Sequence, residues 1–443
     1  MSTRSRGIFH SDIQKRPFWW EAYEPKGYEV KDVPKEIPVA ILGAGYTGLA
    51  AALELRKAGI ESCVLESNEP GYGASTRSGG IVAGCGGIKT PLVNAQYSTE
   101  RFSAILAATT DGFNLVERLI TDENIKCEWH RTGLYKAANT KTHYQILAKK
   151  FDVLQQHDNV TTTLVPVEQQ REQIGSDYYR GGMLTEEAAH LHPALYYKGL
   201  LNACEKRGIK ICAHAEVIDL KENNNHWLVR TKRGDLQADK IIVATNGYTG
   251  DVTSGLKRRM LPLKPYIIAT EVLPDDMADN LSPNNRSIVE SSRIAAFYRL
   301  SGDKGDQRMI FGSRVKWRDI EPDEMAPYLY DIMLKRYPQL NGTRITHAWS
   351  GNVALTLDEQ HHAGKLNGLY YALGCNGSGV ANMTYLGTQI ARKVTTTENY
   401  SCPFDTDDFP DNKYYNGNQR WFIPLIGGFF QFRDWIDRKL DQV

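Results

Sequence analysis

The chain has 443 residues, which is too long for one ordinary hydrophobic core and favours two domains. Hydrophobic residues make up 41% of the sequence and charged residues 24%, which excludes extensive disorder. The formal net charge is only +1 and supplies no field of one sign, so we do not expect nucleic acid as a partner.

The seven cysteines are scattered along the chain and never form a Cys-x-x-Cys pair. Their odd number and irregular spacing predict neither a zinc site nor a disulfide framework, so we expect reduced thiols and no metal. The N-terminus is polar, and no apolar run approaches the about 20 residues that a membrane span needs. These features predict a cytoplasmic protein.

The first predicted elements form a strand–turn–helix–strand unit that follows a polar and aromatic arm at 1–35. An apolar run at 38–42 predicts a buried strand, and 49–55 is rich in strong helix formers. A second buried strand is predicted at 62–66. This order is typical of a βαβ unit with a parallel sheet, and we expect the arm to pack on the surface of the body.

Helical and strand patterns alternate along the remaining chain. Helices are predicted at 100–120, 141–156, 185–207, 325–336 and 378–394. Alternating strands are predicted at 132–137, 215–220, 226–231, 265–273, 294–300 and 308–318. Short apolar runs predict two more buried parallel strands, at 240–245 and 368–373.

Parallel-type strands therefore recur at three separated places, with alternating strands between them. The pattern predicts an α/β fold (α+β overall) in which a Rossmann-type nucleotide-binding domain is made of 36–125, 185–255 and 343–398. A mostly antiparallel β-sheet domain for the substrate would be inserted as 126–184 and 256–342. The arm would end at 35, and 399–443 would be a C-terminal extension with an amphipathic helix.

The turn Gly43-Ala-Gly-Tyr-Thr-Gly48 carries the first chemical signal. Gly43 permits the tight turn, Gly45 lets the backbone approach a pyrophosphate, and Gly48 lets the helix pack close to the sheet. Glu66 ends the next strand, where an acid meets ribose hydroxyls. The alternative is a chance glycine turn, which the strand, helix and acid together disfavour.

Two further glycine-rich segments favour FAD over a nicotinamide dinucleotide. Gly71–Gly80 offers backbone N–H groups, the Ser75 hydroxyl and the Arg77 cation to an anionic ligand. Gly374–Val380 opens a helix whose N-terminus could stabilise negative charge on the flavin N1–C2=O edge. The alternatives are a flexible surface loop for the first segment and an ordinary strand-ending turn for the second.

These motifs resemble the D-amino-acid oxidase/glycine oxidase superfamily of FAD-dependent oxidoreductases, and most closely the gamma-glutamylputrescine oxidase branch. The resemblance also rests on His192-Pro193 and on the segments 243–248, 297–300, 308–312 and 349–351. It implies contacts to FAD from Gly43, Gly45, Tyr46, Thr47, Gly48, Glu66, Ser75, Thr76, Arg77, Ser78, Gly79, Gly80, Val217, Thr245, Asn246, Gly247, Asn376, Gly377, Ser378, Gly379 and Val380.

The sequence departs from the branch at Ser378, where many members carry a histidine, so no role for that imidazole is transferred. Some relatives tether the flavin covalently through Cys or His. Cys85 and Cys375 lie in flavin-facing segments but match no tethering motif, so we expect non-covalent FAD and thiols that act as small buried fillers.

Substrate contacts are expected from the antiparallel domain. The resemblance implies a catalytic cation near flavin N5 at Arg308. Tyr298 and Arg299 adjoin on one strand, so only one can face the flavin. Arg314, with Lys316 and Arg318 on the same face, could clamp a carboxylate, and the alternative is a solvated sheet edge. The predicted substrate-binding residues are Tyr248, Tyr266, Tyr298 and Arg314.

The resulting hypothesis is an FAD-dependent oxidase that takes a hydride from the C–N bond of a small amine or amino acid, with O2 as acceptor. A quinone- or protein-linked dehydrogenase, a nicotinamide-dependent dehydrogenase and a non-catalytic flavin-binding protein remain alternatives. His190 and His192 are interpreted as a helix start rather than a substrate channel. The apolar face of Ile426–Leu440 is expected to pack on the body or on a partner subunit rather than on a membrane.

Overall fold

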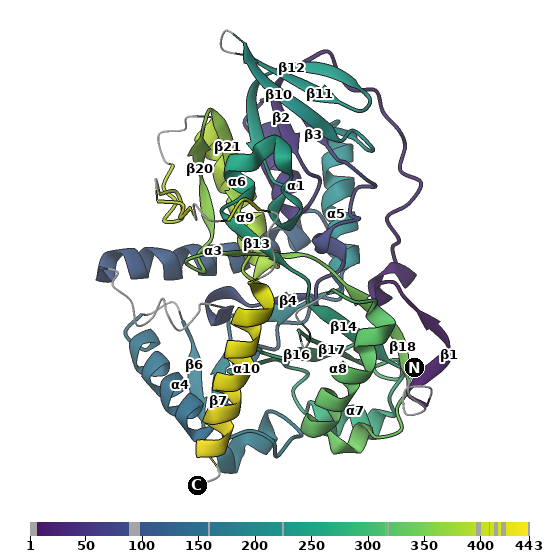
Figure 1. Ribbon diagram of the computed structural model, residues 1–443, viewed down its shortest axis with the longest axis vertical. Helices are drawn as coiled ribbons and strands as arrows, with labels where there is room; N and C mark the ends of the chain where they lie inside the picture. Colours follow the sequence, from purple (N-terminus) through teal and green to yellow (C-terminus); the bar gives the residue numbers. More distant parts are fainter. Residues whose placement is uncertain are drawn as a thin grey trace.

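The computed structural model describes residues 7–87, 98–157, 160–223, 226–314, 316, 319–395, 400–406, 408–411, 415–417 and 422–441. Two large sheets dominate it, one in the upper and one in the lower half of Figure 1. Each sheet has its own hydrophobic core.

The upper sheet has eight strands and is parallel at its centre. Its order is β10-β11-β12-β2-β3-β9, and β21 adds to β12 and to β20. The pairs β21–β12, β12–β2, β2–β3 and β3–β9 are all parallel, as the short apolar runs predicted. The strands are β2 (Glu36–Leu42), β3 (Ser62–Leu65), β9 (Lys210–Cys212), β10 (Val217–Asn223), β11 (His226–Thr231), β12 (Gly234–Val243), β20 (His362–Leu366) and β21 (Leu369–Leu373).

Four helices pack around this sheet, namely α1 (Tyr46–Lys57), α3 (Thr99–Asp122), α5 (Pro193–Lys206) and α9 (Gly379–Val394). The predicted start of α5 at residue 185 is wrong. Pro193 occupies its first turn and His192 caps it by accepting a hydrogen bond from Leu195 N–H on Nδ1 at 3.2 Å. The preceding residues instead form β7 (Gly182–Thr185) and β8 (Ala189–His190), which agrees with the interpretation of His192 as a helix start.

The lower sheet has nine strands in the order β1-β18-β14-β17-β16-β15-β5-β7-β6. All pairs are antiparallel except β1–β18 and β15–β5, which matches the predicted mostly antiparallel domain. The strands are β1 (Phe9–Gln14), β5 (Leu134–Ala137), β6 (Thr162–Val165), β7, β14 (Tyr266–Thr270), β15 (Ser287–Glu290), β16 (Phe297–Ser301), β17 (Arg308–Ser313) and β18 (Ile345–Ser350).

Helices and short ribbons complete the fold. Helix α8 packs on β14, β17 and β18, and α4 packs on β6 and β7. The pair β13–β19 and the pair β4–β8 form small separate ribbons. These elements are α4 (Lys141–Leu154), α6 (Ser254–Lys257), α7 (Asp275–Leu281), α8 (Pro322–Arg336), α10 (Ile423–Leu440), β4 (Ile81–Val82), β13 (Met260–Leu263) and β19 (Val353–Thr356).

The N-terminal arm is more deeply integrated than a surface arm. Its strand β1 extends the lower sheet by pairing with β18. Trp19 is fully buried, and its indole N–H donates to Ser78 O at 2.8 Å. The arm therefore covers part of the lower sheet and supports the glycine-rich segment 71–80.

All seven cysteines lie in described segments and are buried thiols. Among the described residues, no group of three or more His, Cys, Asp or Glu side chains could hold a metal ion. The same part of the chain contains no helix with the length and apolar character needed to cross a membrane.

Candidate active site

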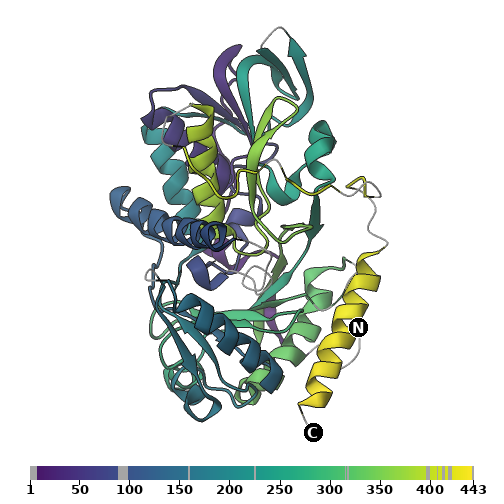
Figure 2. The ribbon, with the colours of Figure 1, turned by 90° about the vertical axis from the view of Figure 1, so that its left-hand side faces the viewer.

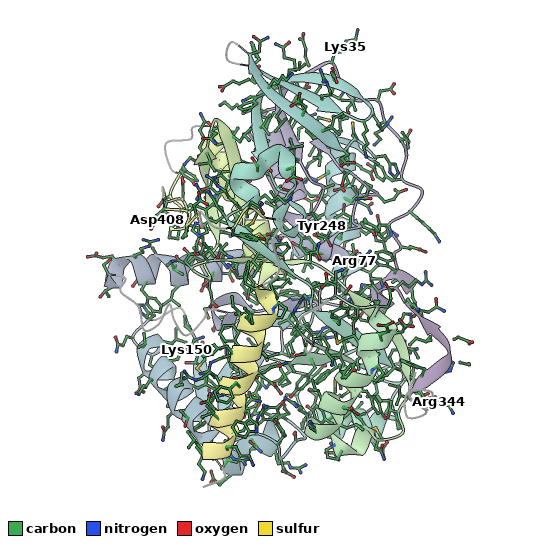
Figure 3. All side chains as sticks on the ribbon, viewed as in Figure 1. Lys35, Arg77, Lys150, Tyr248, Arg344 and Asp408 are labelled. Carbon is green, nitrogen blue, oxygen red and sulfur yellow. The ribbon has the colours of Figure 1, made fainter. Side chains whose placement is uncertain are left out.

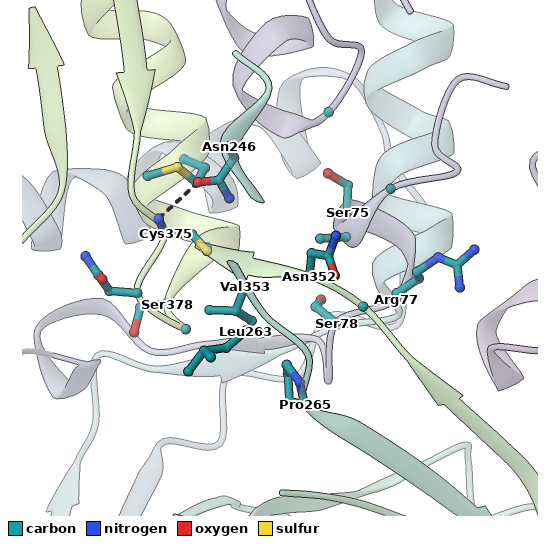
Figure 4. A pocket seen from close by; sticks show the side chains of 18 of the residues that line it. Ser75, Arg77, Ser78, Asn246, Leu263, Pro265, Asn352, Val353, Cys375 and Ser378 are labelled. Carbon is teal, nitrogen blue, oxygen red and sulfur yellow. Dashed lines mark hydrogen bonds between the residues drawn. The ribbon is translucent and has the colours of Figure 1, made fainter. Parts of the chain in front are cut away.

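A cavity of about 1270 Å³ is lined by residues of both sheets (Figure 4). Its volume exceeds the roughly 300–1,000 Å³ of an ordinary small-molecule pocket. Its wall contains parts of all three glycine-rich segments, which are far apart in the sequence. The cavity therefore has room for a dinucleotide together with a second small molecule.

The turn from β2 into α1 forms one part of the wall. Gly43 has a φ of +100°, and an added Cβ would lie 3.1 Å from Ala244 O, so the conformation and the space both require glycine. Gly45 precedes the first turn of α1, where Tyr46 N–H donates to Ser75 Oγ at 3.1 Å. Gly48 does not line the cavity, because it packs directly against the carbonyl of Gly43.

Glu66 lies beside this turn at the end of β3. One carboxylate oxygen accepts from Ala44 N–H at 2.9 Å, and the other accepts from Asn68 N–H at 3.0 Å. The oxygen that accepts from Asn68 also accepts from Ser67 Oγ at 3.2 Å, whereas the oxygen that accepts from Ala44 keeps a lone pair for a further donor. Because Glu66 lines the cavity, it can accept hydrogen bonds from ligand hydroxyls.

The segment 71–80 continues the wall from Ser75 onward. Arg77 touches the cavity, but its guanidinium donates to Tyr72 O at 2.8 Å and to Ser350 O at 3.3 Å. It also lies over the Trp20 ring at 4.6 Å, and burial lowers its pKa. Figure 4 shows Arg77 pointing away from the cavity centre, so it holds the segment in place rather than reaching the ligand. Thr76 is buried outside the cavity and donates to Gly71 O at 2.6 Å.

A buried arginine that the sequence did not assign supports the same segment. Arg299 on β16 donates to Gly79 O at 2.8 Å and to Leu191 O at 2.7 Å. Burial lowers its pKa to about 9, and its guanidinium lies over the Trp19 ring at 5.0 Å. Alternation along β16 was the available signal, because it places Arg299 on the same face as the cavity residue Phe297.

The third segment joins the ends of β12 and β21. Asn246 Oδ1 accepts from the backbone N–H groups of Gly374 at 3.0 Å and Cys375 at 3.3 Å, as Figure 4 shows for Cys375. Gly377 and Ser378 then lead into α9. Gly247 lies behind this wall, against Asn352, and does not line the cavity.

The starts of α1 and α9 thus reach the same cavity, and neither N-cap residue, Gly45 or Ser378, makes a capping hydrogen bond with its own side chain. At the start of α1, Tyr46 N–H is already donated to Ser75 Oγ. An uncapped helix start presents free N–H groups and the positive end of the helix dipole. The cavity therefore offers two helix starts as hydrogen-bond donors, the Glu66 carboxylate as an acceptor, and a turn at which only glycine fits. This set of donors and acceptors fits FAD.

The remaining wall comes from the lower sheet and two helices. It is largely apolar, with a few charged residues of both signs, and its members include Leu134, Lys136, His143, Leu147, Ile267, Val289, Glu290, Ser291, Phe297, Arg314 and Phe430. Phe430 belongs to α10, so the C-terminal helix contributes to the site.

Comparisons with known proteins assign this site to a family. A family model described as FAD dependent oxidoreductase (DAO) matches residues 38–393. The chain belongs to the FAD dependent oxidoreductase family. The resemblance noted from the motifs is therefore confirmed, and FAD is the cofactor that the family implies.

Curated relatives and solved structures agree with this family. Gamma-glutamylputrescine oxidoreductase of Escherichia coli (strain K12) is 30% identical over 355 residues, which cover 80% of this chain and 82% of the relative. Glycine oxidase of Pseudomonas aeruginosa is 26% identical, with 71% and 81% covered. The crystal structure of glycine oxidase from Geobacillus kaustophilus superposes with a TM-score of 0.71 at 17% identity, covering 86% of this chain and 99% of that one, which supports the fold.

Most of the family-implied FAD contacts lie in the wall of the cavity. Those that line it are Gly43, Gly45, Tyr46, Thr47, Glu66, Ser75, Arg77, Ser78, Gly79, Gly80, Val217, Thr245, Asn246, Asn376, Gly377, Ser378, Gly379 and Val380. The other three, Gly48, Thr76 and Gly247, pack behind the wall and shape it.

Of the four predicted substrate residues, Tyr248 and Arg314 line the cavity, whereas Tyr266 and Tyr298 do not. Side chains alternate along a strand, so Ile267 and Phe297 take the cavity face and both tyrosines face the core of the lower sheet. The Tyr298 ring stacks on Phe311 at 5.2 Å. The predicted substrate-binding roles of Tyr266 and Tyr298 do not fit this placement.

Arg308 also lies outside the cavity. Its guanidinium donates to Thr270 O at 3.1 Å and lies over the Phe18 ring at 5.3 Å, where the N-terminal arm covers it. A catalytic role beside the flavin does not fit this position. Of the two cations expected on the face of Arg314, Lys316 lies over the Tyr328 ring at 4.3 Å, and Arg318 falls outside the described residues.

Proposed function

We propose that this protein oxidises the C–N bond of a small amine or amino acid with non-covalently bound FAD and passes the electrons to O2. The observation that supports it best is the convergence of three glycine-rich segments on one cavity whose opposite wall is largely apolar and includes Arg314. The names of the relatives, which include an oxidoreductase of gamma-glutamylputrescine and glycine oxidases, point to the same substrate class.

The chain's own residues would share the work as follows. FAD, when bound, would supply the hydride acceptor for the reaction. The start of α1 would hold the pyrophosphate, and Glu66 the ribose hydroxyls. The start of α9 would stabilise negative charge at the flavin end. Apolar residues such as Ile267 and Phe297 would exclude water around the reacting carbon.

The two thiols near the flavin segments support non-covalent binding. Cys375 touches the cavity, but its Sγ donates to Ala354 O at 3.8 Å. Cys85 is fully buried and does not line the cavity. Burial of this kind suits a packing role better than a tethering role.

The proposal predicts a yellow protein whose flavin leaves with the supernatant after acid precipitation. Anaerobic addition of the right substrate from a panel of gamma-glutamylated polyamines, N-alkyl amino acids and D-amino acids should bleach the flavin. Air should then restore the colour with release of hydrogen peroxide. Flavin that stays with the precipitate would contradict non-covalent binding. Reoxidation by a quinone but not by O2 would favour a dehydrogenase, and no bleaching by any amine would remove the proposed reaction.

Arg314 is the predicted clamp for a substrate carboxylate. Its guanidinium donates to Lys264 O at 2.8 Å, and the side chain reaches the cavity. Arg314→Ala should raise the dissociation constant of carboxylate-bearing substrates about 10- to 100-fold, as expected for loss of a charged hydrogen bond. Arg308→Gln is the matched control and should leave it unchanged. Titrating the bleaching of the flavin with substrate measures the dissociation constant of each variant. Equal dissociation constants in the two variants would contradict the clamp role of Arg314.

A further inference from the structure

Helix α10 lies on the outside of the lower half of the molecule, in front of it in Figure 1 and at its right-hand edge in Figure 2. It lies beyond the family-matched segment 38–393. Its acidic side faces the body. Asp434 accepts from Arg293 Nη1 at 3.0 Å and from Ile294 N–H at 3.1 Å, and Asp437 accepts from Arg293 at 2.6 Å. These contacts fix how the helix is rotated.

The outward side of α10 is apolar. The large residues exposed there are Leu425, Ile426, Phe429, Phe432, Trp435 and Leu440, and about half or more of Phe429, Phe432 and Trp435 is exposed (55%, 56% and 52%). A helix on the surface of a globular protein normally buries its apolar side. The expectation that this face packs on the body is therefore wrong, because the ion pairs of Asp434 and Asp437 turn it outward. An exposed apolar patch of this kind marks an interaction surface.

The charges on α10 are segregated. Both acids of the helix, Asp434 and Asp437, face the body, whereas Arg433, Arg438 and Lys439 are exposed. Aromatic and aliphatic residues flanked only by cations are typical of helices that lie in a membrane interface. Anionic lipid head groups attract such cations.

A second copy of the chain fits this surface less well. In a symmetric dimer the same patch meets itself, so the exposed cations of α10 would face cations with no acid of the helix to pair with them. An anionic lipid surface pairs with the same cations and takes up the aromatic side chains.

We propose that α10 attaches this protein peripherally to an anionic lipid surface. The apolar side would lie among the acyl chains near the head groups, and Arg433 and Lys439 would contact phosphates. Because Phe430 of the same helix lines the cavity, attachment would bring that wall of the site next to the lipid. The attachment does not depend on which amine the protein oxidises.

The test is co-sedimentation of the full-length, FAD-loaded protein with vesicles of phosphatidylcholine alone or mixed with phosphatidylglycerol. Binding should be stronger to the anionic vesicles and should weaken with salt. Phe432→Ser with Trp435→Ser should lower the affinity at least about tenfold, because two aromatic side chains no longer enter the lipid. Arg433→Gln with Lys439→Gln should lower the affinity for anionic vesicles on the order of fivefold for each charge removed, and should leave the affinity for phosphatidylcholine vesicles unchanged.

Tyr328→Ser, on the exposed side of α8, is the matched control and should bind as the unaltered protein does. All altered side chains are exposed, so thermal unfolding should not change. Absence of vesicle binding would overturn the proposal, as would equal binding by the Phe432/Trp435 variant. A concentration-dependent dimer in light scattering that this variant abolishes would assign the face to a second copy instead.

Discussion

Replacing Arg336 by methionine is expected to lower the free energy of unfolding by about 3–5 kcal/mol, because it leaves a buried carboxylate without its cation. Glu290 on β15 is 1% exposed, and Arg336 at the end of α8 is 6% exposed. The pair is bidentate, with Nε–Oε1 at 2.7 Å and Nη2–Oε2 at 3.0 Å. Urea unfolding followed by circular dichroism measures the loss.

The pair also supports the site. Glu290 accepts from Tyr179 Oη at 2.8 Å and from Ala296 N–H at 3.2 Å, which ties β15 to its neighbours. Val289 and Ser291, on either side of Glu290, line the cavity. We therefore expect the Arg336→Met variant to bind substrate more weakly as well, because β15 loses its fixed position.

The pH dependence of this loss has a defined sign. Burial alone raises the pKa of Glu290, but the charge and hydrogen bonds of Arg336, with the other donors, outweigh burial and lower it. A carboxylate whose pKa is lowered in the folded protein stabilises the fold at pH values above its unfolded-state pKa of about 4.3. That stabilisation is lost as the pH falls through the pKa of the folded state. Without Arg336, burial raises the pKa of Glu290. The difference in unfolding free energy between the variant and the unaltered protein should therefore become smaller as the pH falls from about 7 to about 4.

The double variant Glu290→Gln, Arg336→Met is the control. A neutral amide carries no buried charge, so this variant should recover more than half of the lost stability at neutral pH. A single variant as stable as the unaltered protein, or a double variant no better than the single one, would contradict the argument.

Local patterns were sufficient to predict which glycine-rich segments lie around the cavity. The spacing of Gly43, Gly45 and Gly48 between a buried strand and a helix has a direct physical meaning, and the acid that ends the next strand completes it. Short apolar runs identified the parallel strands because strands buried on both faces carry no alternation. The structure places these segments around one cavity.

Long-range packing decided what local patterns could not. The alternation at 297–300 showed that Tyr298 and Arg299 face opposite sides, but only the packing of α8 on the lower sheet shows that the tyrosine side is the core. Arg308 was predicted to lie beside the flavin, but the N-terminal arm returns to this strand and covers Arg308 with Phe18. The outward turn of the apolar face of α10 depends on Arg293, about 140 residues earlier in the chain.

Replacing Gly48 by alanine is expected to abolish FAD binding, although alanine is the better helix former. An added Cβ would lie 1.9 Å from the carbonyl oxygen of Gly43, which belongs to the turn that we propose holds the pyrophosphate. Helix α1 has no room to withdraw. Its other side meets α9 so closely that a Cβ on Gly387 would lie 2.2 Å from Thr47 O. The purified variant should be colourless, and its affinity for added FAD, measured by flavin fluorescence, should fall at least about 100-fold.

Gly428→Ala is the matched control, because this glycine also lies within a helix but an added Cβ would meet nothing within 4 Å. That variant should keep its flavin and gain up to about 1 kcal/mol in unfolding free energy from the higher helix propensity of alanine. The contrast separates contact with the turn from any general effect of altering a helical glycine. A yellow Gly48→Ala protein with unchanged affinity for FAD would contradict this argument. It would mean that the turn and α1 can move apart without harm to the site, so the convergence of the glycine-rich segments would no longer explain cofactor binding.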